Sequence, residues 1–114
     1  MSNQASTIQL DQGLLQEIVR RMVEAMHPLR IVLFGSHARG TASAASDLDL
    51  LVIASSNEPR HRRAIPLYGA LNNILFPMDI VVYTPEEVDE WSGVRQAFVT
   101  TAMREGKVLY EKRA

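Results

Sequence analysis

The stretch from Leu33 to Ile53, LFGSHARGTASAASDLDLLVI, constrains the fold of this chain more than any other part of its sequence. It begins at the end of one short apolar run, 30–34, and finishes in a second, so the pattern predicts two buried strands. The 12 residues between them, 35–46, are at the lower limit for a crossover between parallel strands. The relative direction of the two strands therefore stays open.

Hydrophobic periodicity and capping signals place the remaining elements. Helices are predicted at 10–26, within 60–75, from 84 and at about 94–104, and further strands at 78–84 and 107–111. Thr84 and Glu87 form a capping box, Pro66 is a possible start for its helix, and Gly106 ends the last helix. We expect one small α/β or α+β domain at 10–114, with a mixed sheet of three or four strands flanked by about four helices, after a flexible N-terminus at 1–9.

The composition of the chain argues against several classes of function. The formal net charge of −1 argues against nucleic-acid binding through bulk electrostatics, and the absence of cysteine excludes disulfides, thiolate zinc sites and thiol catalysis. The start of the chain lacks the pattern of a signal peptide, and no apolar run approaches the length that spans a bilayer. We therefore expect a cytoplasmic protein without a membrane or nucleic-acid partner.

Two acidic residues open the second strand, where a buried sheet would exclude them. Alternate residues of a strand share a face at a spacing of about 6.6 Å, so Asp47 and Asp49 are predicted to point the same way as Leu51 and Ile53. Two carboxylates about 5 Å apart repel by roughly 3 kcal/mol at an effective dielectric of about 20. A divalent cation reverses that repulsion, because carboxylate oxygens suit Mg²⁺. The alternatives are that both aspartates lie at a solvated strand end, or that Asp47 caps a turn.

Two further features support a phosphate and metal site. Gly35-Ser36 directly follows an apolar strand, where backbone N–H groups and the hydroxyl of Ser36, the expected N-cap, suit a phosphate. An ordinary strand-to-helix turn would fit equally well if this pair stood alone. Asp79 is a lone acid on an otherwise apolar strand, which is costly unless it is paired, bound to metal or at the strand end. Three carboxylates beside a phosphate turn predict a two-metal site for phosphoryl transfer.

These residues resemble a known family. Gly35-Ser36, the spacer 37–46 and Asp47-Leu48-Asp49 match the signature of the nucleotidyltransferase superfamily that includes polymerase β, and the longer pattern GSxARGxxxxxSDxDLLV resembles the minimal nucleotidyltransferases. The resemblance implies that Gly35 and Ser36 bind the triphosphate and that Asp47 and Asp49 are metal ligands shared with the nucleotide. It also implies that Asp79 binds a second metal and helps to deprotonate the acceptor hydroxyl.

The roles of three neighbouring residues stay open. Arg39 matches the arginine after the Gly-Ser turn, and it either contacts phosphate or braces the loop through a carboxylate. Ser46 either contacts phosphate or holds the turn before Asp47. His37 occupies a variable position of the family pattern and is assigned no role. The cluster Arg60–Arg63 is a solvated face or a contact for an acidic partner or the nucleotide, and Trp91 is expected to pack between helices rather than stack on adenine.

The resemblance also implies substrates and a partner. Two Mg²⁺ ions and ATP are expected, with transfer of AMP to a tyrosine hydroxyl of a HEPN-domain toxin encoded nearby, so that this chain acts as the antitoxin. A domain of this length leaves few residues for a separate acceptor-binding region, which also favours a partner chain in a homo- or hetero-oligomer. The alternative from another class is a non-catalytic or regulatory module that neutralises or scaffolds the HEPN partner by contact. A third reading, a small-molecule acceptor, is disfavoured because such enzymes carry an additional domain.

Overall fold

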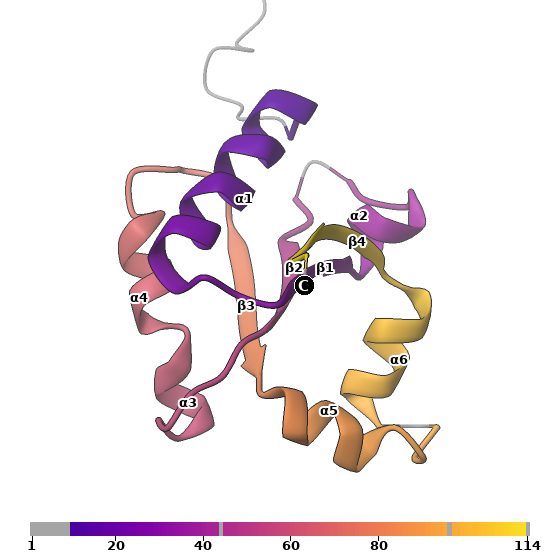
Figure 1. Cartoon of the computed structure of the whole chain (residues 1–114). Helices are drawn as coiled ribbons and strands as arrows, with labels where there is room; N and C mark the ends of the chain where they lie inside the picture. Colours follow the sequence, from indigo (N-terminus) through magenta and orange to yellow (C-terminus); the bar gives the residue numbers. More distant parts are fainter. Residues whose placement is uncertain (1–9, 44, 96, 114) are drawn as a thin grey trace, which may run out of the picture.

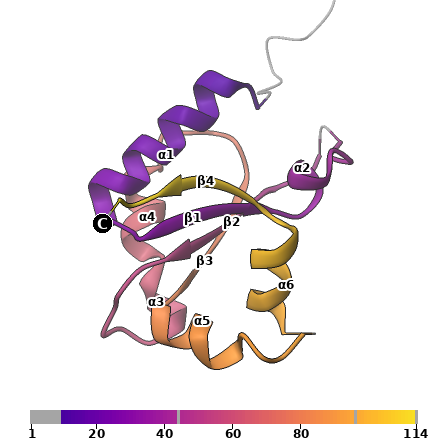
Figure 2. The same ribbon diagram turned by 45° about the vertical axis from the view of Figure 1, so that its right-hand side comes forward.

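A mixed four-stranded sheet organises the part of the chain that the computed structural model describes, residues 10–43, 45–95 and 97–113. The sheet has the order β3-β2-β1-β4, and helices cover both of its faces (Figures 1 and 2). The strands are β1 (Arg30–Phe34), β2 (Leu48–Ile53), β3 (Met78–Tyr83) and β4 (Lys107–Glu111). The helices are α1 (Gln12–Met26), α2 (Ser36–Arg39), α3 (Arg60–Arg63), α4 (Ile65–Ala70), α5 (Pro85–Trp91) and α6 (Phe98–Glu105). The predicted α+β class and mixed sheet are confirmed, whereas the predicted N-terminus at 1–9 lies outside the described residues.

Strand directions follow from the lengths of the connections. β1 pairs antiparallel with both β2 and β4, and β2 pairs parallel with β3. The excursion 35–46 holds only the short α2 and returns the chain antiparallel, while the longer connection through α3 and α4 allows the parallel pairing of β2 with β3. The relative direction of β1 and β2, which the sequence left open, is therefore antiparallel.

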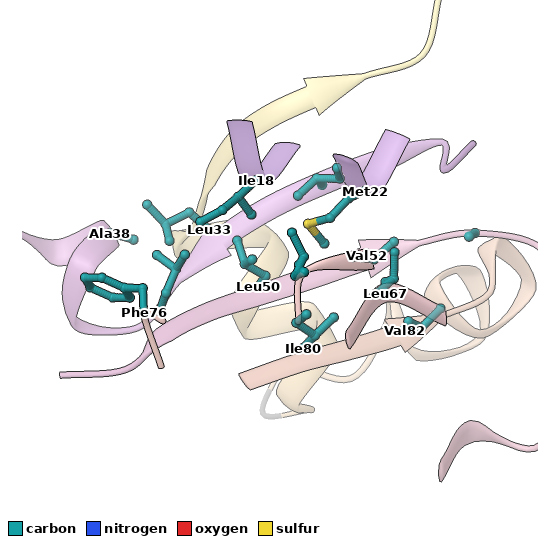
Figure 3. Packing of buried hydrophobic residues seen from close by; sticks show 14 residues of the cluster. Ile18, Met22, Leu33, Ala38, Leu50, Val52, Leu67, Phe76, Ile80 and Val82 are labelled. Carbon is teal, nitrogen blue, oxygen red and sulfur yellow. The ribbon is translucent and has the colours of Figure 1, made fainter. Parts of the chain in front are cut away.

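The main hydrophobic core fills one face of the sheet. Alternate residues of the central strands, such as Leu50 and Val52, meet Ile18 and Met22 of α1 and Leu67 of α4 in a layer of buried side chains (Figure 3). Helix α1 begins after its N-cap Asp11, whose side chain accepts a 2.7 Å hydrogen bond from the Leu14 N–H. Burial of its apolar stripe is the dominant stabilising contribution on this face.

The opposite face carries a smaller core. Val32, Leu51 and Ile53 pack there against Val99 and Ala102 of α6. Asp49 shares the face of Leu51 and Ile53 on β2, since alternate residues of a strand lie on the same side. The candidate site therefore lies on the α6 face, while the α1 face is fully apolar. Within the described residues, no helix is both long and apolar enough to cross a membrane.

Helix boundaries differ from the predictions at two places. The helix expected within 60–75 is split into α3 and α4 and ends at Ala70, after which the polar pair Asn72-Asn73 forms a turn. The helix expected from about 94 begins only at Phe98, because the chain first makes turns whose N–H groups reach back to preceding carbonyls. The capping box of Thr84 and Glu87 and the stop at Gly106 are confirmed.

Two arginines of α3, Arg60 and Arg63, make contacts with other elements of the protein. The Arg63 guanidinium binds both carboxylate oxygens of Glu87, at 2.7 and 3.2 Å, and also donates to the Glu58 carbonyl at 2.9 Å. Arg60 lies over the ring of Tyr83, 4.5 Å from its centroid. Arg63 is therefore not free to contact a partner, because it connects α3 to β3 and α5. Arg60, His61 and Arg62 are exposed, so both interpretations of the cluster remain open for them.

We expect acid to weaken the fold through Glu87. Its hydrogen bond with Arg63 lowers the pKa of this carboxyl from 4.5 to about 2. Since the folded-state pKa lies below the unfolded one, the contribution is complete above pH 4.5 and is lost as the pH falls toward 2, by about 3 kcal/mol. Urea unfolding between pH 6 and pH 2, compared with Glu87→Gln, measures this contribution.

Glu87→Gln distinguishes the contribution of Glu87 to acid stability from that of Glu17, a second acid with a low pKa. Hydrogen bonds from Arg20 and Arg21 lower the pKa of Glu17 to about 2 as well, but Glu17 lies on the exposed surface of α1, where salt screens its interactions. Glu87→Gln should therefore have a lower stability at pH 6 and a flatter acid profile that persists at high salt. An unchanged profile would contradict the assignment to Glu87.

Candidate active site

The phosphate turn predicted at Gly35-Ser36 follows β1 directly. Gly35 has φ 75° and ψ −157°, a conformation that is essentially confined to glycine. Its carbonyl accepts from the N–H groups of Ala38 and Arg39, both at 3.1 Å, so the chain closes into the single turn of α2. Gly35, rather than Ser36 as predicted, is the N-cap, and Ser36 is the first helical residue.

Gly35 also meets the second aspartate of the D-x-D motif. A Cβ atom at Gly35 would overlap Oδ2 of Asp49 and would lie 3.1 Å from its Cγ. The absence of a side chain thus lets the carboxylate lie directly against the backbone of the phosphate turn. The glycine is needed both for its backbone conformation and for this close approach.

Asp49 and Asp79 are neighbours in the sheet. In the parallel β2–β3 register they are direct partners, on strands that lie about 4.8 Å apart, and Phe34 is the partner of Asp49 on β1. Asp47 precedes the first residue of β2 and is exposed, so the prediction that it lies on the strand is corrected by one residue. The strand register thus makes Asp49 and Asp79 partners, which sequence spacing alone could not indicate.

The three aspartates interact electrostatically. Burial raises the pKa of Asp49 above its usual value, and the charges of Asp79 and Asp47 raise it further. His37 and Arg39 act in the opposite direction. This pattern of burial and like charges is typical of functional sites, since a fold pays for it without structural gain.

His37 joins the two halves of the motif, a role that sequence reasoning did not assign. Its Nε2 lies 3.2 Å from the Ser46 carbonyl, directly before Asp47, and its ring packs edge-on against Phe76 at 5.7 Å. Since a carbonyl only accepts, Nε2 must be the protonated nitrogen. The Ser46 hydroxyl accepts a hydrogen bond from the Ser43 N–H at 2.9 Å. Of the two roles predicted for Ser46, this contact corresponds to holding the turn before Asp47.

Arg39 is exposed beside a small pocket. The pocket, about 260 Å³, lies between the phosphate turn and α6, and its lining includes Phe34, Gly35, Arg39, Phe98 and Glu105. A guanidinium at its rim suits a phosphate oxygen, the first of the two alternatives for Arg39. Two larger hollows, of about 470 Å³ between α1 and β4 and of about 550 Å³ beside the ends of β1, β2 and β4, include none of the three aspartates in their linings.

A divalent cation fits the chemistry of the carboxylates but would need further ligands. Within residues 10–43, 45–95 and 97–113, no three His, Asp or Glu side chains form a group that holds an ion by itself. Mg²⁺ ordinarily keeps several waters and takes one or two carboxylates together with substrate phosphates. Asp47, Asp49 and Asp79 are consistent with that incomplete protein shell.

We expect Gly35→Ala to cost more stability than Gly40→Ala. Both glycines have positive φ, so alanine strains either position by about 1–3 kcal/mol. The strain is larger at Gly35, whose ψ of −157° is essentially confined to glycine, than at Gly40, which is in the left-handed helical region with ψ 17°. Only at Gly35 does the new Cβ overlap Asp49, whereas no atom lies within 4 Å at Gly40. Urea unfolding of both variants measures the difference. Equal losses would show that the close approach of Asp49 is not a constraint.

Comparison with known proteins agrees with this geometry. A protein of Methanocaldococcus jannaschii described as a candidate protein adenylyltransferase is 62% identical over 34 residues, which span 30% of this chain and 22% of that protein. The crystal structure of a candidate nucleotidyltransferase from Sulfolobus solfataricus has a TM-score of 0.62 at 20% identity, over 88% of this chain and 79% of that one, which shows a shared fold.

The nucleotidyltransferase domain family matches residues 14–113. That range extends from α1 to the residues after β4 and contains the phosphate turn and all three aspartates. The chain therefore belongs to the nucleotidyltransferase domain family.

Proposed function

We propose that this protein transfers AMP from Mg-ATP to a tyrosine hydroxyl of a HEPN-domain partner, and thereby acts as an antitoxin. The observation that carries the proposal is that the Gly35 turn, Asp49 and Asp79 form a row across the adjacent strands β1, β2 and β3. The choice of AMP and of a protein acceptor is supported by the similarity to the Methanocaldococcus protein. The HEPN partner follows from the sequence resemblance to minimal nucleotidyltransferases.

Each residue of the candidate site has a distinct role in this proposal. The N–H groups and hydroxyl at Gly35-Ser36 hold the triphosphate, and Arg39 balances its charge. Asp47 and Asp49 would hold Mg²⁺, and Asp79 would complete a second cation site. Bound Mg²⁺ supplies charge neutralisation for the triphosphate. Asp79, which is exposed and directly beside Asp49, orients the acceptor hydroxyl and takes its proton.

The alternative is a non-catalytic module that neutralises the partner by contact. It requires no functional carboxylates, yet the protein maintains Asp49 in a partly buried position next to two further acids. Like charges held together at a cost to the fold favour the enzyme.

The proposal predicts AMP addition to the partner. Intact-mass spectrometry of the HEPN-domain protein encoded beside this chain, after incubation with Mg²⁺ and ATP, should show a gain in multiples of the AMP residue. Asp49→Asn and Asp79→Asn should each slow the transfer by roughly 100- to 1,000-fold, because each removes a charge that acts on the reacting phosphate. A stable complex without AMP addition would support the non-catalytic module instead.

The melting temperature shows whether these variants remain folded. Because the pKa of Asp49 is raised in the folded state, its ionised form opposes folding, and stability is lost as the pH rises through that pKa. Asp49→Asn keeps the uncharged state at all pH values. Without metal at pH 7, it should therefore melt no lower than the wild type, so that its slower transfer with Mg²⁺ and ATP cannot be attributed to unfolding.

His37 should affect the rate through its hydrogen bond and the stability through its ring. His37→Gln retains an N–H donor for the Ser46 carbonyl, whereas His37→Phe retains only the packing against Phe76. We expect kcat/KM for AMP transfer to fall roughly fivefold in His37→Phe and to stay near wild type in His37→Gln. Thermal stability should fall more in His37→Gln than in His37→Phe, because only the phenylalanine keeps the packing against Phe76. If the rate followed the ring instead, His37 would not position Asp47.

A further inference from the structure

Aromatic side chains gather on the face of the sheet that carries Asp49 and Asp79. Figure 2 shows α5 and α6 on this side of the sheet, away from α1. The chain has three Phe, one Trp and three Tyr residues, and four of them lie on this face or on the helices beside it: Phe34, Tyr83, Trp91 and Phe98. Such a concentration of rings beside the carboxylates points to a role in the site.

Phe98 is the central member of this group. Its ring lies 5.2 Å from the ring of Phe34, nearly at right angles, and 6.2 Å from the ring of Tyr83, measured between centroids. Phe34 is in turn the strand partner of Asp49. Phe98 nevertheless remains 45% exposed. A ring that two neighbours hold in place and that still presents much of its surface to solvent is available to a ligand.

Two hollows meet at Phe98. One is the pocket of about 260 Å³ beside the Gly35 turn. The other, of about 180 Å³, is named here the aromatic recess, and its lining includes Arg60, Tyr83, Trp91 and Phe98. Ligand sites usually enclose about 300–1,000 Å³, so either hollow alone is small. A ligand with one end at the Gly35 turn and the other in the aromatic recess would use both.

The walls of the aromatic recess are held in place. Trp91, which was expected to pack between helices, is 41% exposed and lines the recess. Its carbonyl accepts from the Thr100 hydroxyl at 2.6 Å and from the Val94 N–H at 2.9 Å, so α6 anchors the end of α5. The Arg60 guanidinium lies over the ring of Tyr83. Planar groups held in this way suit a flat aromatic ligand, because nucleobases stack on aromatic rings and on guanidinium groups.

The position of the recess distinguishes a nucleobase from the ring of an acceptor tyrosine, and from this step the inference rests on the proposed function. Tyr83 follows Asp79 by four residues, about 13 Å along β3. A tyrosine hydroxyl is bonded directly to its ring, so an acceptor ring must stay close to the reacting phosphate and to Asp79. The ribose separates the base of a nucleotide from its α-phosphate. The base can therefore lie further along β3, toward Tyr83.

We propose that the aromatic recess binds the adenine of ATP, which stacks on Phe98 and lies against Trp91. The triphosphate occupies the neighbouring pocket at the Gly35 turn, and Phe98, which lines both hollows, contacts the nucleoside between them. The acceptor hydroxyl then approaches the α-phosphate from the side of Asp79. Base and acceptor thus use different parts of one face of the sheet.

Trp91 provides a direct test, because it is the single tryptophan of the chain. Its fluorescence is recorded during titration with Mg-ATP and, separately, with Mg-tripolyphosphate, which has the phosphates but no base. We expect Mg-ATP to quench Trp91 and tripolyphosphate to leave it unchanged. Calorimetry should give a Kd about tenfold lower for Mg-ATP. Equal Kd values and the same fluorescence change with both ligands would overturn the proposal.

A pair of variants tests Phe98 itself. Phe98→Leu should raise the Kd for Mg-ATP about tenfold, because it removes the stacking ring. Its Kd for tripolyphosphate should not change, which shows that the phosphate turn is still folded. Tyr68→Leu is the control, since Tyr68 is similarly exposed, at 42%, but lies on α4, which packs against the opposite face of the sheet. Tyr68→Leu should change neither Kd.

The outcomes separate the aromatic recess from the proposed function. If the wild type distinguishes Mg-ATP from tripolyphosphate but adds no AMP to the HEPN-domain protein encoded beside this chain, the proposed function fails and the recess stands. If the wild type transfers AMP and Phe98→Leu keeps its Kd for Mg-ATP, the recess is overturned alone. A raised KM for the acceptor in that variant would then assign the recess to the acceptor. If the wild type binds neither ligand, both proposals are rejected.

Discussion

The contact between the Asp49 carboxylate and the backbone of Gly35 is the constraint on which the candidate site depends. Antiparallel pairing of β1 with β2 places Phe34 opposite Asp49, so the next residue must turn across the carboxylate. Only a residue without Cβ, in a conformation open to glycine, can do so. The turn that presents backbone N–H groups and the acid that suits a cation are thereby built as one unit.

The protein tolerates its concentrated negative charge because the two faces of the sheet have different tasks. The α1 face is a continuous apolar layer, and it stabilises strands whose other face carries Asp49 and Asp79. Asp47 and Asp79 remain exposed, where water screens their repulsion of the partly buried Asp49. Positive groups are also kept apart: Arg63 is used by Glu87, while Arg39 stays near the site.

Much of the fold could be predicted from the sequence because the signals were local. A short apolar run indicated β2, and the capping box of Thr84 and Glu87 indicated the start of α5. Predictions failed where tertiary contacts overrode periodicity. The apolar spacing up to Leu75 suggested one long helix, yet Leu71 and Phe76 are buried from a turn while Leu75 is exposed.

The sequence by itself determined which chemical groups the site contains, because Gly35-Ser36, the D-x-D pair and Asp79 are defined by residue type and spacing. Only the tertiary structure decided how they meet. Strand register, which depends on pairing between distant segments, makes Asp49 and Asp79 neighbours and places Asp79 on an edge strand. The hydrogen bond from His37 to Ser46 likewise depends on the fold, since nothing in the pattern distinguishes a histidine that reaches a particular carbonyl from one that does not.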